Sequence, residues 1–100
     1  MKTREDIIQT LAKEKSSLER EFHVRNLALF GSYAREEQSE ASDVDVLVDV
    51  DPSIGLRFVI LAERIEKVLG VHVDLVSRRA INAREWKLIE PELIYVKAAD

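Results

Sequence analysis

Hydrophobic residues recur with helical spacing in three stretches of this 100-residue chain. Residues 3–22 place apolar side chains every three or four positions and charged side chains on the opposite side, which is typical of an amphipathic helix. Residues 55–69 repeat the pattern, and Gly70 is well placed to end that helix in a left-handed conformation. Residues 78–89 have weaker helical character, and Pro91 should stop it. The pattern therefore predicts three helices.

The segments between these helices read as strands. Residues 24–30 end in a nearly continuous apolar run, as in a strand buried on both faces. From residue 43 to 51, valine alternates mainly with aspartate, so a valine face should enter the core and an aspartate face should meet solvent or a cleft. Residues 71–76 alternate similarly, and residues 93–96 complete the set as an edge strand. These elements predict an α/β (α+β) fold, with a small sheet of three to four strands flanked by helices.

Length and composition restrict the possible classes of protein. One hundred residues predict a single domain over 1–100, and 46% hydrophobic with 34% charged residues is typical of a globular protein. The chain has no apolar run long enough for a membrane span and no signal-peptide core. The absence of cysteine excludes disulfides and thiolate zinc sites and favours a cytoplasmic location. A net charge of −4 argues against direct nucleic-acid binding.

The candidate chemistry begins with Asp43 and Asp45. Residues two apart on a strand point to the same side, with α-carbons roughly 6.5–7 Å apart. Two like charges held in this way repel, and a bound cation is the usual remedy. Oxygen-only ligands favour a hard ion such as Mg²⁺. A solvated acidic face explains Asp49 and Asp51 well, but it explains Asp43 and Asp45 less well because aspartate is depleted in strands.

A turn follows the first predicted strand at Gly31 and Ser32. Glycine permits a tight turn and close approach by a ligand, and Ser32 could cap a short helix over residues 33–36. Free backbone N–H groups there would suit a triphosphate, although such a turn by itself is more often an ordinary one. Asp74 lies within an otherwise apolar strand. If that strand pairs with the one carrying Asp43 and Asp45, three carboxylates can meet above one sheet face.

Two further sets of residues have open interpretations. His72 neighbours Asp74 in sequence, and a packing or hydrogen-bonding role is expected for it rather than metal ligation. The basic residues after the third strand could approach an anionic ligand or could form a solvated helix face; they are Arg78, Arg79 and Arg84.

The combined pattern resembles a known family. Gly31-Ser32-x-x-Arg35, Ser42-Asp43-x-Asp45 and the later Asp74 are similar to the active-site pattern of the nucleotidyltransferase superfamily that includes DNA polymerase β. The fit is closest to the minimal nucleotidyltransferases of prokaryotic toxin–antitoxin pairs, and it covers nearly the whole chain. The fold implied is a small mixed sheet flanked by helices. One position departs from the pattern. Glu36 stands where the family usually has glycine, and glutamate enters positive-φ conformations less readily and adds negative charge beside the implied phosphate site.

The resemblance implies a reaction and assigns roles to six residues. A nucleoside monophosphate would pass from a nucleoside triphosphate to a hydroxyl, with pyrophosphate leaving. The implied Mg²⁺ ligands of a two-metal site are Asp43, Asp45 and Asp74, which are also the implied catalytic residues. The implied triphosphate contacts are Gly31, Ser32 and, more weakly, Arg35.

The resemblance also implies a partner. In the minimal branch the acceptor is a toxin of the HEPN ribonuclease type, silenced by AMP placed on a tyrosine. The leading hypothesis is therefore an antitoxin that uses ATP to adenylylate its cognate toxin in a hetero-oligomer. Two alternatives remain: an antitoxin that acts by binding alone, which Glu36 favours, and a nucleotide-transfer subunit that acts on a small molecule.

Overall fold

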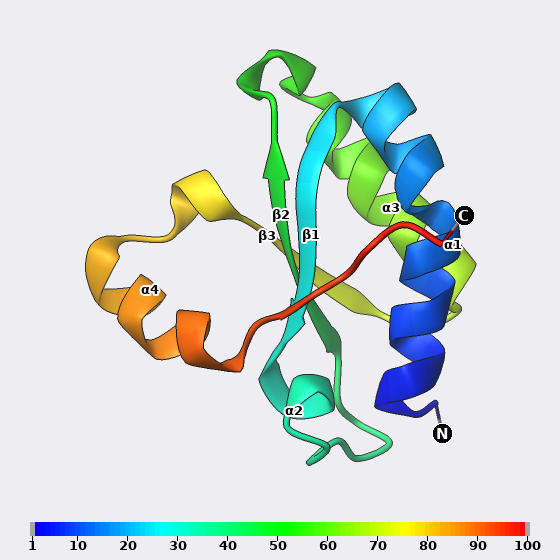
Figure 1. The fold of residues 1–100 in the computed structure, drawn as a ribbon, viewed down its shortest axis with the longest axis vertical. Coiled ribbons are helices and arrows are strands. Elements are labelled where there is room, and N and C mark those ends of the chain that lie inside the picture. The colour runs from blue at the N-terminus through cyan, green and yellow to red at the C-terminus, as the bar shows by residue number, and fades with distance from the viewer. Residues whose placement is uncertain (1, 100) are drawn as a thin grey trace.

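A four-stranded mixed sheet with the order β3-β2-β1-β4 organises the chain (Figure 1). The computed structural model describes residues 2–99. Strand β1 pairs antiparallel with β2 and β4, whereas β2 pairs parallel with β3. In chain order, the helices and strands are α1 (Arg4–Phe22), β1 (Val24–Phe30), α2 (Gly31–Ala34), β2 (Val44–Val50), α3 (Arg57–Leu69), β3 (Val73–Ser77), α4 (Ala83–Ile89) and β4 (Ile94–Tyr95). The fold class predicted from the sequence is confirmed.

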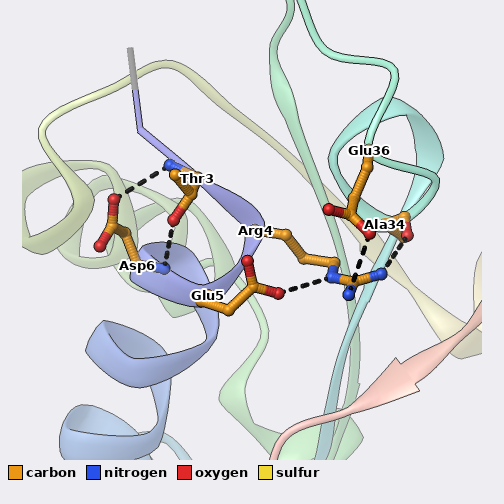
Figure 2. Close-up of polar contacts among 6 residues, drawn as sticks. All are labelled: Thr3, Arg4, Glu5, Asp6, Ala34 and Glu36. Carbon is orange, nitrogen blue, oxygen red and sulfur yellow. Dashed lines mark hydrogen bonds and ion pairs between the residues drawn. The ribbon is translucent and has the colours of Figure 1, made fainter.

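The first helix begins at a capping box. The Asp6 backbone N–H donates to the Thr3 hydroxyl at 3.1 Å, and the Thr3 N–H donates back to the Asp6 carboxylate at 3.0 Å (Figure 2). These bonds satisfy two donors that a helix start otherwise leaves free. The apolar stripe of α1 then packs on the sheet, with Ile7, Leu11 and Leu18 fully buried.

The sheet has two unequal faces. Helices α1 and α3 cover one face, and α4 lies on the other (Figure 1). The alternating valines of β2 all point into the α1–α3 core, as the alternation predicts; they are Val44, Val46, Val48 and Val50. A second, smaller cluster lies under α4, where Ala28, Leu47 and Ile81 are buried. The packing is therefore closed on the first face and sparse on the second.

Element boundaries differ from the prediction in the second half of the chain. Helix α3 starts at Arg57 rather than at residue 55, because Gly55 adopts φ 51° after a short 3₁₀ turn over Pro52–Ile54. Gly70 ends α3 with φ 70°, as predicted. The predicted helix over residues 78–89 divides into a 3₁₀ turn, Arg78–Ala80, and α4. The division occurs because Asn82 caps α4 by accepting the Glu85 N–H at 2.8 Å.

The strands at the two sheet edges are also shorter or displaced. The strand predicted over residues 71–76 spans Val73–Ser77, and the one predicted over 93–96 shrinks to Ile94–Tyr95. None of the helices formed by residues 2–99 has the length and apolar content needed to cross a membrane.

Candidate active site

Strand register places the candidate carboxylates together. Asp45 pairs with Asp74 across the parallel β2–β3 ladder, so their side chains stand level on one face of the sheet. Asp43 lies two residues before Asp45, and the adjoining Val44 N–H donates to the His72 carbonyl at 3.0 Å. The predicted meeting of carboxylates from two neighbouring strands is seen for Asp45 and Asp74, whereas Asp43 lies just before the start of β2. Asp45 is half-buried, whereas Asp43 and Asp74 are exposed.

The cluster is electrostatically unbalanced. Burial raises the pKa of Asp45, and the negative charges of Asp74 and Asp43 raise it further. Glu92 acts in the same direction, and Arg35 opposes it. Because ionised carboxylates at this spacing repel, the site favours any ligand that brings positive charge.

The same residues have the donor chemistry for a hard divalent cation, although they do not form a ready-made cage. Among residues 2–99, no three acidic or histidine side chains stand close enough together to hold a metal ion. The Asp43 carboxylate lies 3.1 Å from His72 Nδ1, and His72 Nε2 lies 3.6 Å from Glu66. The His72 side chain therefore lies between the Asp43 and Glu66 carboxylates. The carboxylates offer only oxygen donors, and the half-buried Asp45 stands among other negative charges. Both features fit Mg²⁺.

Gly31 is required where it stands. It adopts φ 76°, and an added methyl group would collide with the carboxylate of Asp45. The turn therefore lies directly against the acidic cluster, because only glycine offers both the conformation and the space. The predicted capping role of Ser32 is wrong. Helix α2 begins at Gly31, so Ser32 lies inside the helix, and Phe30 at its N-cap makes no side-chain hydrogen bond. Ser32 is half-buried beside this turn.

Arg35 is engaged in two ion pairs. Its Nε lies 2.8 Å from Glu37 and its Nη1 lies 2.9 Å from Glu92. The hydrogen bonds that Arg35 donates to Glu37 and to Glu92 raise its pKa above the usual value. Glu92 also accepts the Gly31 N–H at 3.0 Å. The turn that the sequence assigns to phosphate contacts thus holds an internal carboxylate.

Glu36 adopts the conformation that the family's glycine would provide. Its φ is 59°, in the left-handed region. Its carboxylate lies 3.1 Å from Arg4 Nη2, and the Arg4 Nη1 donates to the Ala34 carbonyl at 3.3 Å (Figure 2). Glu36 therefore adopts a positive φ despite its side chain, and Arg4 balances the added negative charge.

The basic residues after β3 lie away from the acids. The Arg78 guanidinium stacks over the Trp86 ring at 3.7 Å from its centroid. Arg79 lines a separate cavity of about 380 Å³ beyond the end of β2. Because Asp74 is near the start of β3 and these arginines follow its end, the structure favours the solvated-face alternative. A cavity of about 420 Å³ lies beside Asp43 and His72, bordered by Tyr33 and Ser42.

Two contributors to the site escaped sequence reasoning. Glu92 is 61 residues from Gly31, in a Glu-Pro-Glu segment that resembles an exposed helix stop. Arg4 lies in the first turn of α1, 32 residues before its partner Glu36. No local spacing links either pair, so only the folded chain reveals them.

A family model described as a nucleotidyltransferase domain matches residues 8–97. A Methanocaldococcus jannaschii protein named "Putative protein adenylyltransferase MJ1379" is 45% identical over 101 residues, covering 96% of this chain and 100% of that protein. The protein adenylyltransferase MntA of Thermococcus cleftensis is 42% identical over 98 residues, covering 96% and 98%.

Solved structures share the fold. One described as a "putative minimal nucleotidyltransferase" has a TM-score of 0.78 and 31% identity, covering 93% of this chain and 95% of that one. A structure described as a toxin–antitoxin with AMP-PNP has a TM-score of 0.60 and 22% identity, covering 97% of this chain and 74% of that one. At that identity the second likeness shows the fold alone.

Proposed function

This chain belongs to the nucleotidyltransferase domain family, and from that premise we propose that it transfers AMP from ATP to a hydroxyl of a partner protein. The observation that carries the proposal is the level pairing of Asp45 with Asp74, next to Asp43 and directly against the Gly31 turn. The relatives named protein adenylyltransferases support AMP as the transferred group and a protein as the acceptor.

The residues have the following roles in the proposed mechanism. Asp43, Asp45 and Asp74 would hold Mg²⁺. When bound, the metal supplies positive charge that offsets the charge of the phosphates as pyrophosphate leaves. The Gly31 N–H, Ser32 and Arg35 would contact the triphosphate. The positive charge of the cation would offset the neighbouring negative charges that raise the pKa of Asp45.

The acceptor approaches from the open edge of the sheet. Asp74 is exposed on β3, an edge strand, so an incoming hydroxyl can reach it. Its carboxylate would orient that hydroxyl and take up its proton. The hydroxyl oxygen bonds to the α-phosphorus, the bond from that phosphorus to pyrophosphate breaks, and the proton leaves the hydroxyl.

The partner proposed is a toxin of the HEPN ribonuclease type, modified on a tyrosine within a hetero-oligomer. The toxin–antitoxin structures of the same fold support a toxin as partner, and the one with AMP-PNP supports ATP as the nucleotide. The chain would act as a single nucleotidyltransferase domain in the cytoplasm. The partner would supply the surface that positions its hydroxyl.

The test uses ATP labelled on the α-phosphate, Mg²⁺ and the protein encoded by the neighbouring gene. Label should appear on that protein with the wild-type chain and should vanish with Asp43→Asn. Asp49→Asn is the matched control, because it removes the same charge from the same face of β2, four residues beyond Asp45. That control should label normally.

The outcomes separate the alternatives. If no label appears and Asp43→Asn still neutralises the partner, the chain acts by binding alone. If label leaves ATP but enters only a small molecule, the acceptor proposal fails and the small-molecule alternative stands. Equal loss with Asp43→Asn and Asp49→Asn would contradict the assignment of the metal site.

A further inference from the structure

One side chain occupies both identified donors of the turn. The Glu92 carboxylate accepts the Gly31 N–H at 3.0 Å through Oε1 and the Arg35 Nη1 at 2.9 Å through Oε2. Its side chain is only 26% exposed, so it is set into the site rather than lying over it. A phosphate oxygen would make the same bonds, because it also accepts from a backbone N–H and pairs with a guanidinium. Glu92 and a triphosphate therefore compete for the same donors.

The position of Glu92 is electrostatically unfavourable for a purely structural brace. It adds a carboxylate near Asp45, and its charge is among those that raise the pKa of Asp45. Arg35 is the cation that opposes this effect. Repulsion from the Asp45 carboxylate weakens the bonds that Glu92 makes. The two hydrogen bonds hold Glu92 in place against that repulsion.

The segment that carries Glu92 is lightly anchored. The structure describes every residue of Arg78–Ala80, α4 and Glu90–Glu92, and none of them is buried. Ile81 is the buried contact of this region, with Trp86, Ile89 and Leu93 partly buried against the same small cluster. Segments with few buried apolar contacts open at low free-energy cost. Glu92 can therefore leave the turn without unfolding the α1–α3 core.

We propose that Glu92 is an intramolecular competitor of the nucleotide, whose carboxylate holds the Gly31 N–H and the Arg35 guanidinium until a triphosphate displaces it. This inference rests on the proposed function, because it assigns the triphosphate to that turn. Displacement moves the segment over residues 83–92, so nucleotide binding and the position of α4 are linked. The apparent affinity for ATP is then the affinity of the free turn multiplied by the fraction of molecules in which Glu92 is not seated.

The experiment measures binding of Mg²⁺–AMP-PNP by calorimetry to the wild-type chain and three variants. Glu92→Gln removes the competing charge, and Glu92→Ala removes the competing group. Both should bind more tightly, by about tenfold if Glu92 is seated in roughly nine-tenths of the molecules. Glu90→Gln is the matched control, because it removes the same charge from the same 3₁₀ turn. Its affinity should equal that of the wild type.

A second readout uses Trp86, the one tryptophan in the sequence. Because Trp86 lies on α4 under the Arg78 guanidinium, its fluorescence reports movement of this segment. AMP-PNP should change the Trp86 emission of the wild type. This measurement does not need the Glu92 variants, so it remains available if they do not fold. Unchanged emission in the nucleotide-bound wild type would overturn the proposal.

The direction of the affinity change decides between competitor and brace. Weaker or unchanged binding by folded Glu92→Gln and Glu92→Ala would make Glu92 a positioning residue that keeps Arg35 in place. If no variant and no wild-type sample binds the nucleotide, the proposed function itself fails. If the Glu92 variants bind AMP-PNP and the wild type does not, Glu92 excludes the nucleotide from the turn, which supports the proposal.

Discussion

The two faces of the sheet place opposite demands on the same strand. On the α1–α3 face, β2 contributes four valines to a closed core, and Leu11, Leu61 and Ile65 are fully buried against them. On the α4 face, the same strand presents Asp45 and Asp49, and the apolar cluster is small. Neighbouring residues of β2 thus serve stability on one side and charge on the other.

The difference shows where this fold gains and loses free energy. Burial of apolar surface stabilises the α1–α3 face by about 25 cal/mol for each Å² removed from water. The carboxylates of the α4 face work against folding, since burial and like charges raise the pKa of Asp45. A cluster that costs stability persists where it serves function, so substitutions on the two faces should separate activity from stability.

The largest expected effect comes from Asp45→Asn. Loss of a carboxylate that is proposed to hold Mg²⁺ should lower AMP transfer on the order of 10³-fold. The same change removes a like charge, so the free energy of unfolding should rise by about 0.5–1 kcal/mol. Transfer is measured with labelled ATP, and stability by urea denaturation. A variant that is both inactive and less stable would contradict the comparison, because Asp45 would then be a structural residue.

The pH dependence of stability is the control for that interpretation. Asp45 has a usual pKa of 3.8, and its folded-state pKa is raised. A raised acid contributes stability that is fully present below the unfolded pKa and is lost as pH rises through the folded value. Wild type and Asp45→Asn should therefore be equally stable below pH 3.8, and the variant should gain its advantage as pH rises from 3.8 through the folded pKa and keep it above that value. An advantage that is constant with pH would point to packing rather than charge.

The second effect tests the α1–α3 face with one residue type in two environments. Leu61 is fully buried on α3, whereas Leu56, just before the same helix, is 92% exposed. Leu61→Ala should lower the free energy of unfolding by about 3 kcal/mol, because it leaves a cavity in the closed core. Leu56→Ala should change it by less than about 0.5 kcal/mol. Urea denaturation gives both values, and equal losses would mean that the exposed leucine packs in solution.

Sequence reasoning succeeded where the information is local and periodic. The spacing of Asp43 and Asp45 places them on one face of any strand, and the isolated acid at Asp74 marks the partner strand. It failed where the information is conformational or distant. The φ of 76° at Gly31 starts α2 a residue before Ser32, which residue preferences alone do not fix. Glu92 is 61 residues from Gly31, so no local sequence pattern predicts the contact between them.

The smallest expected effect concerns Glu36, the departure from the family pattern. Glu36→Gly should relieve left-handed strain of about 1 kcal/mol but lose a surface ion pair with Arg4 and make the unfolded chain freer. The net change in the free energy of unfolding should stay within about 0.5 kcal/mol. Because the backbone already has φ 59°, AMP transfer should remain near the wild-type rate.

Glu36→Ala isolates the backbone contribution to that small balance. Alanine loses the Arg4 ion pair as glycine does, but it keeps the Cβ that disfavours positive φ. The alanine variant should therefore be less stable than the glycine variant by a measurable margin of up to about 1 kcal/mol in urea denaturation. Equal stabilities would mean that the loop of the alanine variant leaves the left-handed conformation, and that Glu36 changes the backbone beside the site. AMP transfer well above the wild-type rate in the glycine variant alone would also mean that Glu36 changes that backbone, because glycine would have restored the family's geometry.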